Sequence, residues 1–157
     1  MGRFGRWLRD HPNFLAKTYA FAERFVKGLA PLLEKIGYDR VERIIKPPED
    51  WAKSLVFGCQ MCGQCILHST GMTCPMTCPK NLRNGPCGGV RLNGHCEVKP
   101  EMRCVWVEAF ERSEKMTVYS NEMRILQPPV NRELGHRSAW VTMLTEEDQI
   151  VSPGWER

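Results

Sequence analysis

Eight cysteines constrain the fold of this chain more than any other feature, because all of them lie in one stretch of the sequence. Residues 57–104 are dense in Cys, Gly, Pro and Asn and hold few apolar runs long enough for regular structure. Burial of apolar side chains cannot offset the entropy of ordering such a segment, so it needs metal ions or covalent bridges. The cysteines are Cys59, Cys62, Cys65, Cys74, Cys78, Cys87, Cys96 and Cys104.

The first three cysteines are separated by two residues each, in the order Cys59, Cys62 and Cys65. This spacing turns successive thiolates inward and points backbone amides at the cluster sulfides, as in proteins that hold a 4Fe–4S cluster. Gly63 removes a Cβ where the backbone must approach closely. Cys74 is the predicted fourth ligand, because it is the nearest cysteine and is followed by proline, as fourth ligands often are.

The remaining four cysteines, Cys78, Cys87, Cys96 and Cys104, could bind a second cluster or a zinc ion, and their wide spacing leaves both open. Zinc is also the rival for the triplet. Structural zinc sites favour paired Cys-x-x-Cys units, however, and the overlapping triplet leaves one thiol spare. Iron–sulfur is therefore favoured for the triplet.

Two histidines, His68 and His95, lie among the cysteines and are expected at the surface or behind the ligands, because eight thiols are already present. A disulfide scaffold is disfavoured, since no secretory signal supports an oxidising compartment.

The chain has 157 residues and is 42% hydrophobic, which is enough for one compact domain with a modest core. We expect an α-rich small protein with an irregular, Cys-rich metal-binding core flanked by helices. The expected segments are an N-terminal helical region (1–56), a Cys-rich metal-binding domain (57–115) and an extended C-terminal tail (116–157).

The N-terminal region shows an amphipathic pattern with helical spacing. Pro12 supplies the first turn of a helix, which Gly28 and Pro31 are expected to break or kink. The stripe is wide and rich in Phe, so part of it is expected to meet a partner. Its apolar positions are Phe14, Leu15, Tyr19, Phe21, Ala22, Phe25, Val26 and Leu29.

Beyond this region the pattern predicts shorter elements. A short helix over 40–45 is expected to stop at the Pro47-Pro48 pair, and another is expected from there through Leu55. A further helix leaves the cysteine region at Cys104. Residues 117–157 read as irregular, and the tryptophans in this tail, Trp140 and Trp155, suggest docking onto another surface.

The net charge is +4, with a basic N-terminal part and an acidic C-terminal part. Basic and acidic positions interleave along the helices, so we expect no nucleic-acid binding. No segment approaches the roughly 20 apolar residues that would span a bilayer. Without a signal peptide, the expected location is cytoplasmic and away from membranes. No nucleophile–base set or phosphate-binding loop is present, so the chain is expected to be a non-catalytic subunit.

The run from Cys59 to Trp106 resembles the cysteine-rich C-terminal domain of methylenetetrahydrofolate reductases. The resemblance leaves residues 1–46 and the tail after residue 115 uncovered. The motifs that carry it combine cysteines with glycines and prolines: Cys59-x-x-Cys62-Gly63-x-Cys65-x-Leu67, Thr70-Gly71-x-x-Cys74-Pro75-Met76-x-Cys78-Pro79-Lys80, Asn84-Gly85-Pro86-Cys87-Gly88-Gly89, Gly94-x-Cys96-Glu97-Val98 and Cys104-Val105-Trp106.

The resemblance implies a chain similar to the small iron–sulfur subunit of the reductases of acetogenic bacteria. Its partner would be a flavin-bearing barrel subunit or a related one-carbon enzyme. Its role would be to relay electrons to that flavin or to hold the complex together. A barrel needs about 250 residues, so reductase activity is expected on another polypeptide. A non-redox, zinc-binding assembly module for a one-carbon enzyme is the alternative.

Overall fold

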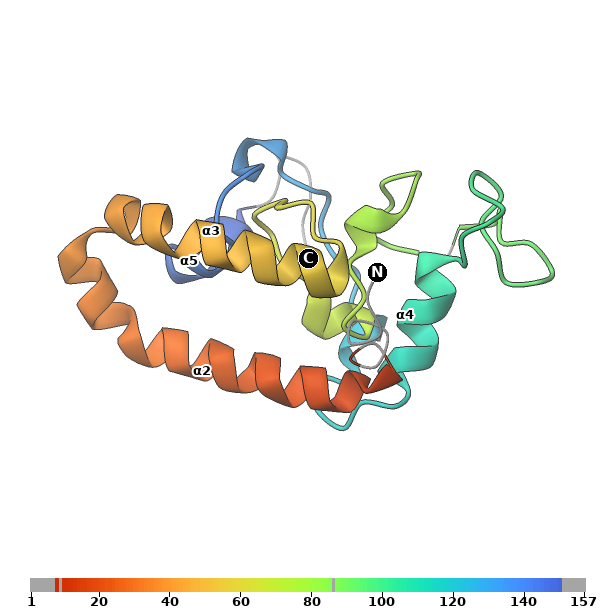
Figure 1. Ribbon diagram of the computed structural model, residues 1–157, viewed down its shortest axis with the longest axis horizontal. Helices are drawn as coiled ribbons and strands as arrows, with labels where there is room; N and C mark the ends of the chain where they lie inside the picture. The colour runs from red at the N-terminus through yellow and green to blue at the C-terminus, as the bar shows by residue number, and fades with distance from the viewer. Residues whose placement is uncertain (1–7, 9, 86, 151–157) are drawn as a thin grey trace. The chain divides into compact units, whose positions relative to one another are not determined.

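The computed structural model describes residue 8, residues 10–85 and residues 87–150. These residues form α-helices, 3-10 turns and two isolated β-bridges, but no β-strand (Figure 1), so the predicted α-rich fold with an irregular cysteine region is confirmed. The chain divides into two compact units, which we call unit 1 (residues 1–17 and 66–127) and unit 2 (18–65 and 128–157). The segment boundaries expected from the sequence stay a prediction.

No described helix combines the length and the apolar character that a bilayer-crossing segment requires.

Helix α2, Pro12–Ile36, begins at the predicted proline and runs without interruption to Gly37. A break at Gly28 and Pro31 is therefore wrong, and the alternative, a kink, stays a prediction. Pro31 removes one hydrogen bond, to the carbonyl of Lys27. Both residues are solvent-exposed, so water can take the place of the missing donor.

The apolar stripe of α2 is only half-buried, and its phenylalanines are largely exposed. Phe21 and Phe25 are 72% and 59% exposed and stack on each other with ring centroids 6.5 Å apart. The expectation that this face meets a partner stays a prediction.

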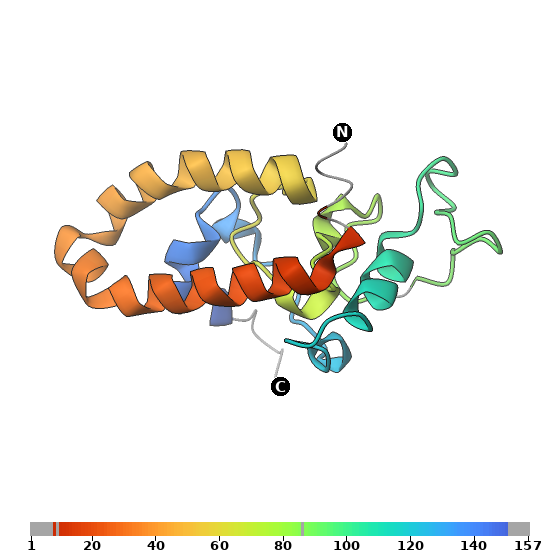
Figure 2. The same cartoon turned by 60° about the horizontal axis from the view of Figure 1, so that its bottom comes forward.

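Helix α3, Tyr38–Phe57, follows a turn at Gly37, which takes a positive φ of 91°. It runs back in the opposite direction to α2 (Figure 2). The sequence predicted two short helices separated at Pro47-Pro48, and this is wrong, since one helix crosses both prolines.

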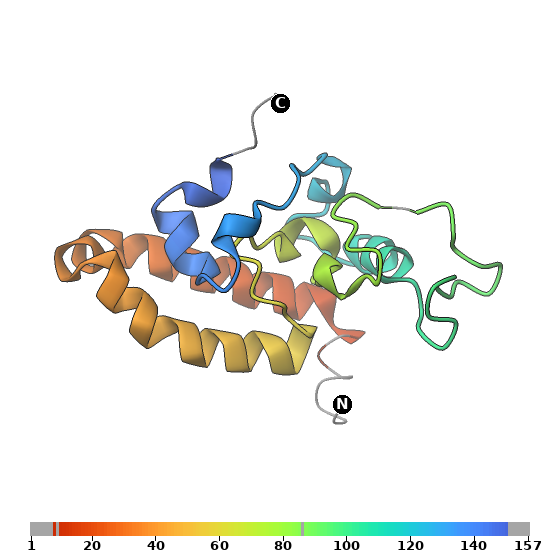
Figure 3. The same cartoon turned by 90° about the horizontal axis from the view of Figure 1, so that it is seen from above.

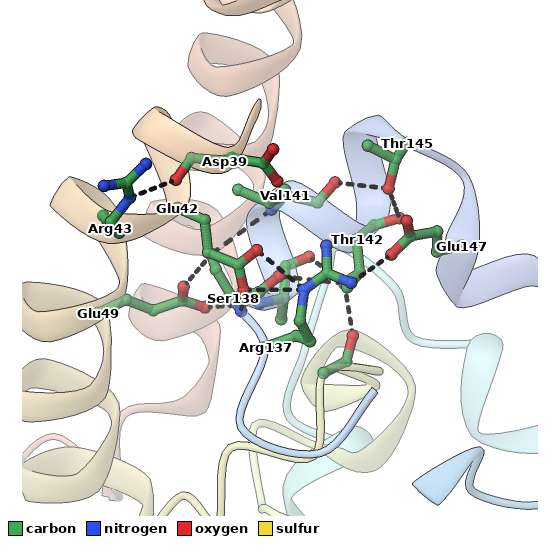
Figure 4. A network of polar contacts seen from close by, with 12 residues as sticks. Asp39, Glu42, Arg43, Glu49, Arg137, Ser138, Val141, Thr142, Thr145 and Glu147 are labelled. Atoms are coloured by element: carbon green, nitrogen blue, oxygen red, sulfur yellow. Dashed lines mark hydrogen bonds and ion pairs between the residues drawn. The ribbon is translucent and has the colours of Figure 1, made fainter. Parts of the chain in front are cut away.

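The physical reason is a contact made by residues 137–139, far along the chain (Figure 4). Glu42, before the prolines, accepts hydrogen bonds from Arg137 Nε at 2.8 Å and Ser138 N at 2.9 Å. Glu49, after them, accepts one from Ser138 Oγ at 2.5 Å and one from Ala139 N at 3.2 Å. Residues 137–139 therefore hold the two halves of α3 together across the prolines.

The last described part of unit 2 contains helix α5, Ala139–Leu144, which the sequence interpretation missed. Ser138 caps it by accepting a hydrogen bond from Val141 N, and α5 packs against α3 (Figure 3). The centroid of the Trp140 ring lies 5.3 Å from that of the Tyr19 ring. The predicted docking of Trp140 is therefore confirmed, and the surface that it contacts belongs to the same chain. Trp155 lies outside the described residues.

Unit 1 is built around helix α4, Val105–Ser113, which confirms the helix predicted to leave the cysteine region. It packs against two 3-10 turns, η1 (Leu67–Thr70) and η2 (Pro75–Thr77). Two of the cysteines share its apolar core, which contains Cys78, Cys104, Val105, Trp106 and Ala109. The other 3-10 turns of the described residues are η3 (Glu122–Arg124), η4 (Arg132–Leu134) and η5 (Glu147–Gln149).

Candidate metal centre

Cys59, Cys62 and Cys65 lie together on one loop of unit 2, directly after α3. Gly58 ends α3 in the left-handed conformation, and two further residues of the loop also have positive φ, Met61 at 45° and Gly63 at 73°. Left-handed residues reverse the chain sharply, and this is what brings closely spaced cysteines onto one short loop.

Within this loop, backbone and sulfur atoms make local contacts. The Met61 amide donates to Cys59 Sγ at 3.3 Å, and the Cys62 thiol donates to the Gln64 carbonyl at 3.6 Å. An amide directed at sulfur stabilises negative charge on it, and the thiolate is the form that binds metal. The donor set is therefore of the sulfur-rich type that iron–sulfur groups and zinc use.

A buried lysine adds positive charge beside this loop. Lys53 is paired with Glu49 at 2.5 Å, and its ammonium lies over the Trp140 ring. Burial by itself lowers the pKa of Lys53, but the charges of Cys65, Glu49 and Cys59 raise it, and the resulting pKa lies above its usual value. The ammonium thus attracts negative charge at these two cysteines. Sequence reasoning missed Lys53.

The loop is also held from outside by residues 131–148, which we call the C-terminal clamp. Four hydrogen bonds between described residues join loop and clamp. Two are accepted by loop carbonyls, and two involve the buried side chain of Gln64, which sequence reasoning did not single out. They are Asn131 N to Gln64 Oε1 at 2.7 Å, His136 N to Met61 O at 2.7 Å, Thr142 Oγ1 to Gly63 O at 2.5 Å and Gln64 Nε2 to Asp148 O at 3.1 Å.

Gly63 is the point of closest approach between loop and clamp. A Cβ at this position would overlap the Leu134 carbonyl oxygen and lie 2.9 Å from Leu134 Cβ. The predicted need for glycine is confirmed here, and the close neighbour is the clamp backbone. One signal in the sequence could have revealed α5, the helical part of the clamp: Ser138 stands where a helix N-cap is expected, before an apolar run.

The other five cysteines belong to unit 1. Cys78 and Cys104 are buried in its apolar core beside Trp106, and Cys74 is buried at the start of η2. Cys74 as the fourth ligand of the triplet stays a prediction.

Cys87 and Cys96 lie on an irregular segment, residues 87–104, which we call the hairpin loop. Cys87 Sγ accepts from Gly89 N at 3.3 Å and from Lys80 Nζ at 3.6 Å, and Lys80 also pairs with Glu97. The hydrogen bond to Glu97 is the main reason that the pKa of Lys80 lies above its usual value. Cys96 forms one of the two β-bridges that shape the loop, with Val90.

None of the eight cysteines forms a disulfide in the structure. Among the described residues, no three His, Cys, Asp or Glu side chains converge as a ready metal site. The histidines have other partners: His68 pairs with Glu122, and His95 Nδ1 lies 2.7 Å from the Pro100 carbonyl. The assignment of particular cysteines to a metal stays a prediction.

Comparison with known proteins gives one family. Its model, described as methylene-tetrahydrofolate reductase C terminal, matches residues 38–133. The match is longer than the resemblance seen in the cysteine motifs, because it includes the whole of α3 and extends to the beginning of the clamp. No curated protein and no solved structure matches the chain.

Proposed function

Because the chain belongs to the family of methylene-tetrahydrofolate reductase C-terminal domains, we propose that it is the iron–sulfur subunit of a reductase-like complex in one-carbon metabolism. Its described residues form helices and irregular loops without strands, so they do not build a flavin-bearing barrel. In this proposal the barrel is a cytoplasmic partner that carries the reductase chemistry, and this chain relays electrons to it.

The observation that carries the proposal is the construction of the Cys59–Cys65 loop. Three thiols lie on seven residues, one sulfur receives a backbone amide, and the buried Lys53 supplies positive charge. The proposed ligands are Cys59, Cys62 and Cys65, with the fourth predicted to be Cys74. An iron–sulfur cluster bound here would supply one-electron transfer. Cluster binding requires the thiol side chains to turn toward a common point, since they do not converge without it.

The remaining cysteines would hold a second cluster or a zinc ion. Cys87 resembles Cys59 in that its sulfur accepts from the amide two residues later, at the same distance of 3.3 Å. Cys78 and Cys104 are near one another in an apolar core, which would shield a metal from water. These contacts support metal binding in unit 1 without distinguishing iron from zinc.

The chain's own residues would have three roles around the bound group. Lys53 and the Met61 amide offset the negative charge of the thiolates and so would raise the reduction potential. The clamp buries Met61 and Gln64 and so keeps water from one side of the loop. The exposed aromatic side chains of the long helices, Phe21, Phe25 and Trp51, would meet the partner.

The test is an anaerobic purification of the full chain, followed by iron, sulfide and zinc analysis and a visible spectrum. Iron and sulfide near four or eight per chain, with a brown band that bleaches with dithionite, are expected. Cys62→Ser should remove one cluster, whereas Ser120→Ala, at an exposed serine outside the loop, should leave the metal content unchanged. A colourless protein that contains zinc alone would overturn the proposed electron relay. It would favour the alternative, a zinc-binding assembly module.

A further inference from the structure

Unit 1 contains a cavity of about 150 Å³ whose lining includes no cysteine. Its wall is fixed by side-chain contacts among three segments. The Asn84 side chain pairs with both the N–H and the carbonyl of Gln127, and Gln127 Nε2 donates to Ser69 Oγ at 3.1 Å. The lining residues are Ser69, Thr70, Arg83, Asn84, Gly85, Trp106 and 123–127.

The cavity lining is positively charged. It includes two arginines, Arg83 and Arg124, and no aspartate or glutamate. Arg83 is only 7% exposed, and its Nε and Nη1 atoms are fully buried. A guanidinium in such surroundings attracts anions more strongly than one in water does, because the local dielectric constant is lower.

A second observation also indicates a ligand. Trp106 is 5% exposed, and its indole Nε1 is buried and has no hydrogen-bond partner among the described residues. The ring cannot turn easily to find one, because it packs directly against Gly85, where a Cβ would overlap the ring. Buried tryptophan N–H groups usually have an acceptor, so an acceptor from outside the chain would complete this site.

We propose that this cavity binds a small oxyanion with a carboxylate or phosphate group. The guanidinium of Arg83 offers a planar pair of donors that matches two oxygens of such a group, and the Trp106 N–H offers a third donor. The volume suits a small anion and is too small for a nucleotide. The proposal does not depend on which metal the cysteines hold.

The test is calorimetric titration of the metal-loaded full chain with inorganic phosphate and, separately, with malonate at constant ionic strength. Saturable binding of one anion per chain is expected for at least one of the two, and the stronger binder identifies the chemistry. Trp106→Phe keeps an aromatic ring at this position and removes the indole N–H together with part of the ring, so it should weaken binding about fivefold to tenfold. Arg83→Gln should abolish binding.

Two matched controls separate this site from general charge attraction. Trp140→Phe makes the same change in unit 2, and Arg91→Gln removes an exposed arginine outside the cavity; both should bind like the unaltered chain. If Arg83→Gln fails to fold, the anion affinity of Trp106→Phe still tests the proposal. Equal affinity of Trp106→Phe and the unaltered chain, or no saturable binding at millimolar concentrations, would overturn the proposal.

Discussion

The Cys59–Cys65 loop and the hairpin loop both carry closely placed cysteines, but they are held in different ways. The first is bound by a segment about 70 to 80 residues later in the sequence, through four hydrogen bonds and one close backbone approach. The second is shaped by local bonds, such as Cys96 N to Met102 O and Cys104 N to Gly94 O, both at 2.9 Å. Gly88 and Gly94 there face open space.

This difference separates two routes to an ordered cysteine loop. Where the rest of the chain fixes the loop, a bound metal would add to an existing order. Where mainly local bonds act, a bound metal would have to supply more of the order, and its binding energy would become folding energy. The comparison predicts that single substitutions near the first loop are costly and that those near the hairpin loop are mild.

The largest effect is expected for Lys53→Met. It leaves the Glu49 carboxylate buried without its cation, so the free energy of unfolding should fall by about 3 kcal/mol or more, as measured by urea denaturation. The second change Glu49→Gln should restore most of this loss. Lys80→Met, beside Cys87, is the matched control, and because its ion pair is exposed the change should be far smaller. Equal losses for both lysines would contradict the comparison.

The next effect is expected for Gly63→Ala. The methyl group overlaps the Leu134 carbonyl, and alanine is strained at a φ of 73°, so stability should fall by about 3 kcal/mol. Gly94→Ala meets no atom but has a φ of 77°, so about 1 kcal/mol is expected. Gly88→Ala has neither problem and should stay within about 0.5 kcal/mol. If thermal unfolding ranks the stability losses of the three variants in a different order, the proposed difference between the two loops is contradicted.

A smaller effect is expected for Thr142→Val. It removes the hydroxyl that donates to Gly63 O and leaves a buried carbonyl unpaired, at a cost of about 1–2 kcal/mol. Metal release to a chelator should become faster in parallel. Thr145→Val is the control, because that hydroxyl bonds only to carbonyls of its own helix. If Thr142→Val releases metal at the same rate as the unaltered chain, the clamp does not contribute to metal retention.

The smallest difference in free energy is expected between the two loops when bound metal is removed. Amide hydrogen exchange measured by mass spectrometry should rise more in the hairpin loop than in the Cys59–Cys65 loop, by about tenfold, which corresponds to about 1.4 kcal/mol. The amides of α4 serve as an internal reference. A larger rise in amide exchange in the Cys59–Cys65 loop than in the hairpin loop would contradict the comparison.

What the sequence predicted well depends on neighbouring residues. Pro12 starts α2, and α4 follows Cys104, because caps and periodicity act within one or two helical turns. The family was also readable, because the cysteine motifs are long and specific. Gly63 was recognised as a place of close approach, although its neighbour Leu134 could not be named.

What the sequence did not reveal depends on distant residues. Pro47-Pro48 normally interrupts a helix, and the contacts of residues 137–139 with Glu42 and Glu49 explain why α3 continues. The burial of Lys53 beside the cysteines has the same origin, since no local pattern distinguishes it from a solvated lysine.

The position of the clamp near the end of the described chain has a consequence for synthesis. A ribosome adds about 5–20 residues per second, so Thr142 is made roughly 4–15 s after Cys65. During that interval the three thiols exist on a nascent chain whose enclosing segment has not been made. Metal delivery during translation would therefore meet an open loop, whereas delivery to the finished protein would meet one already held by the clamp.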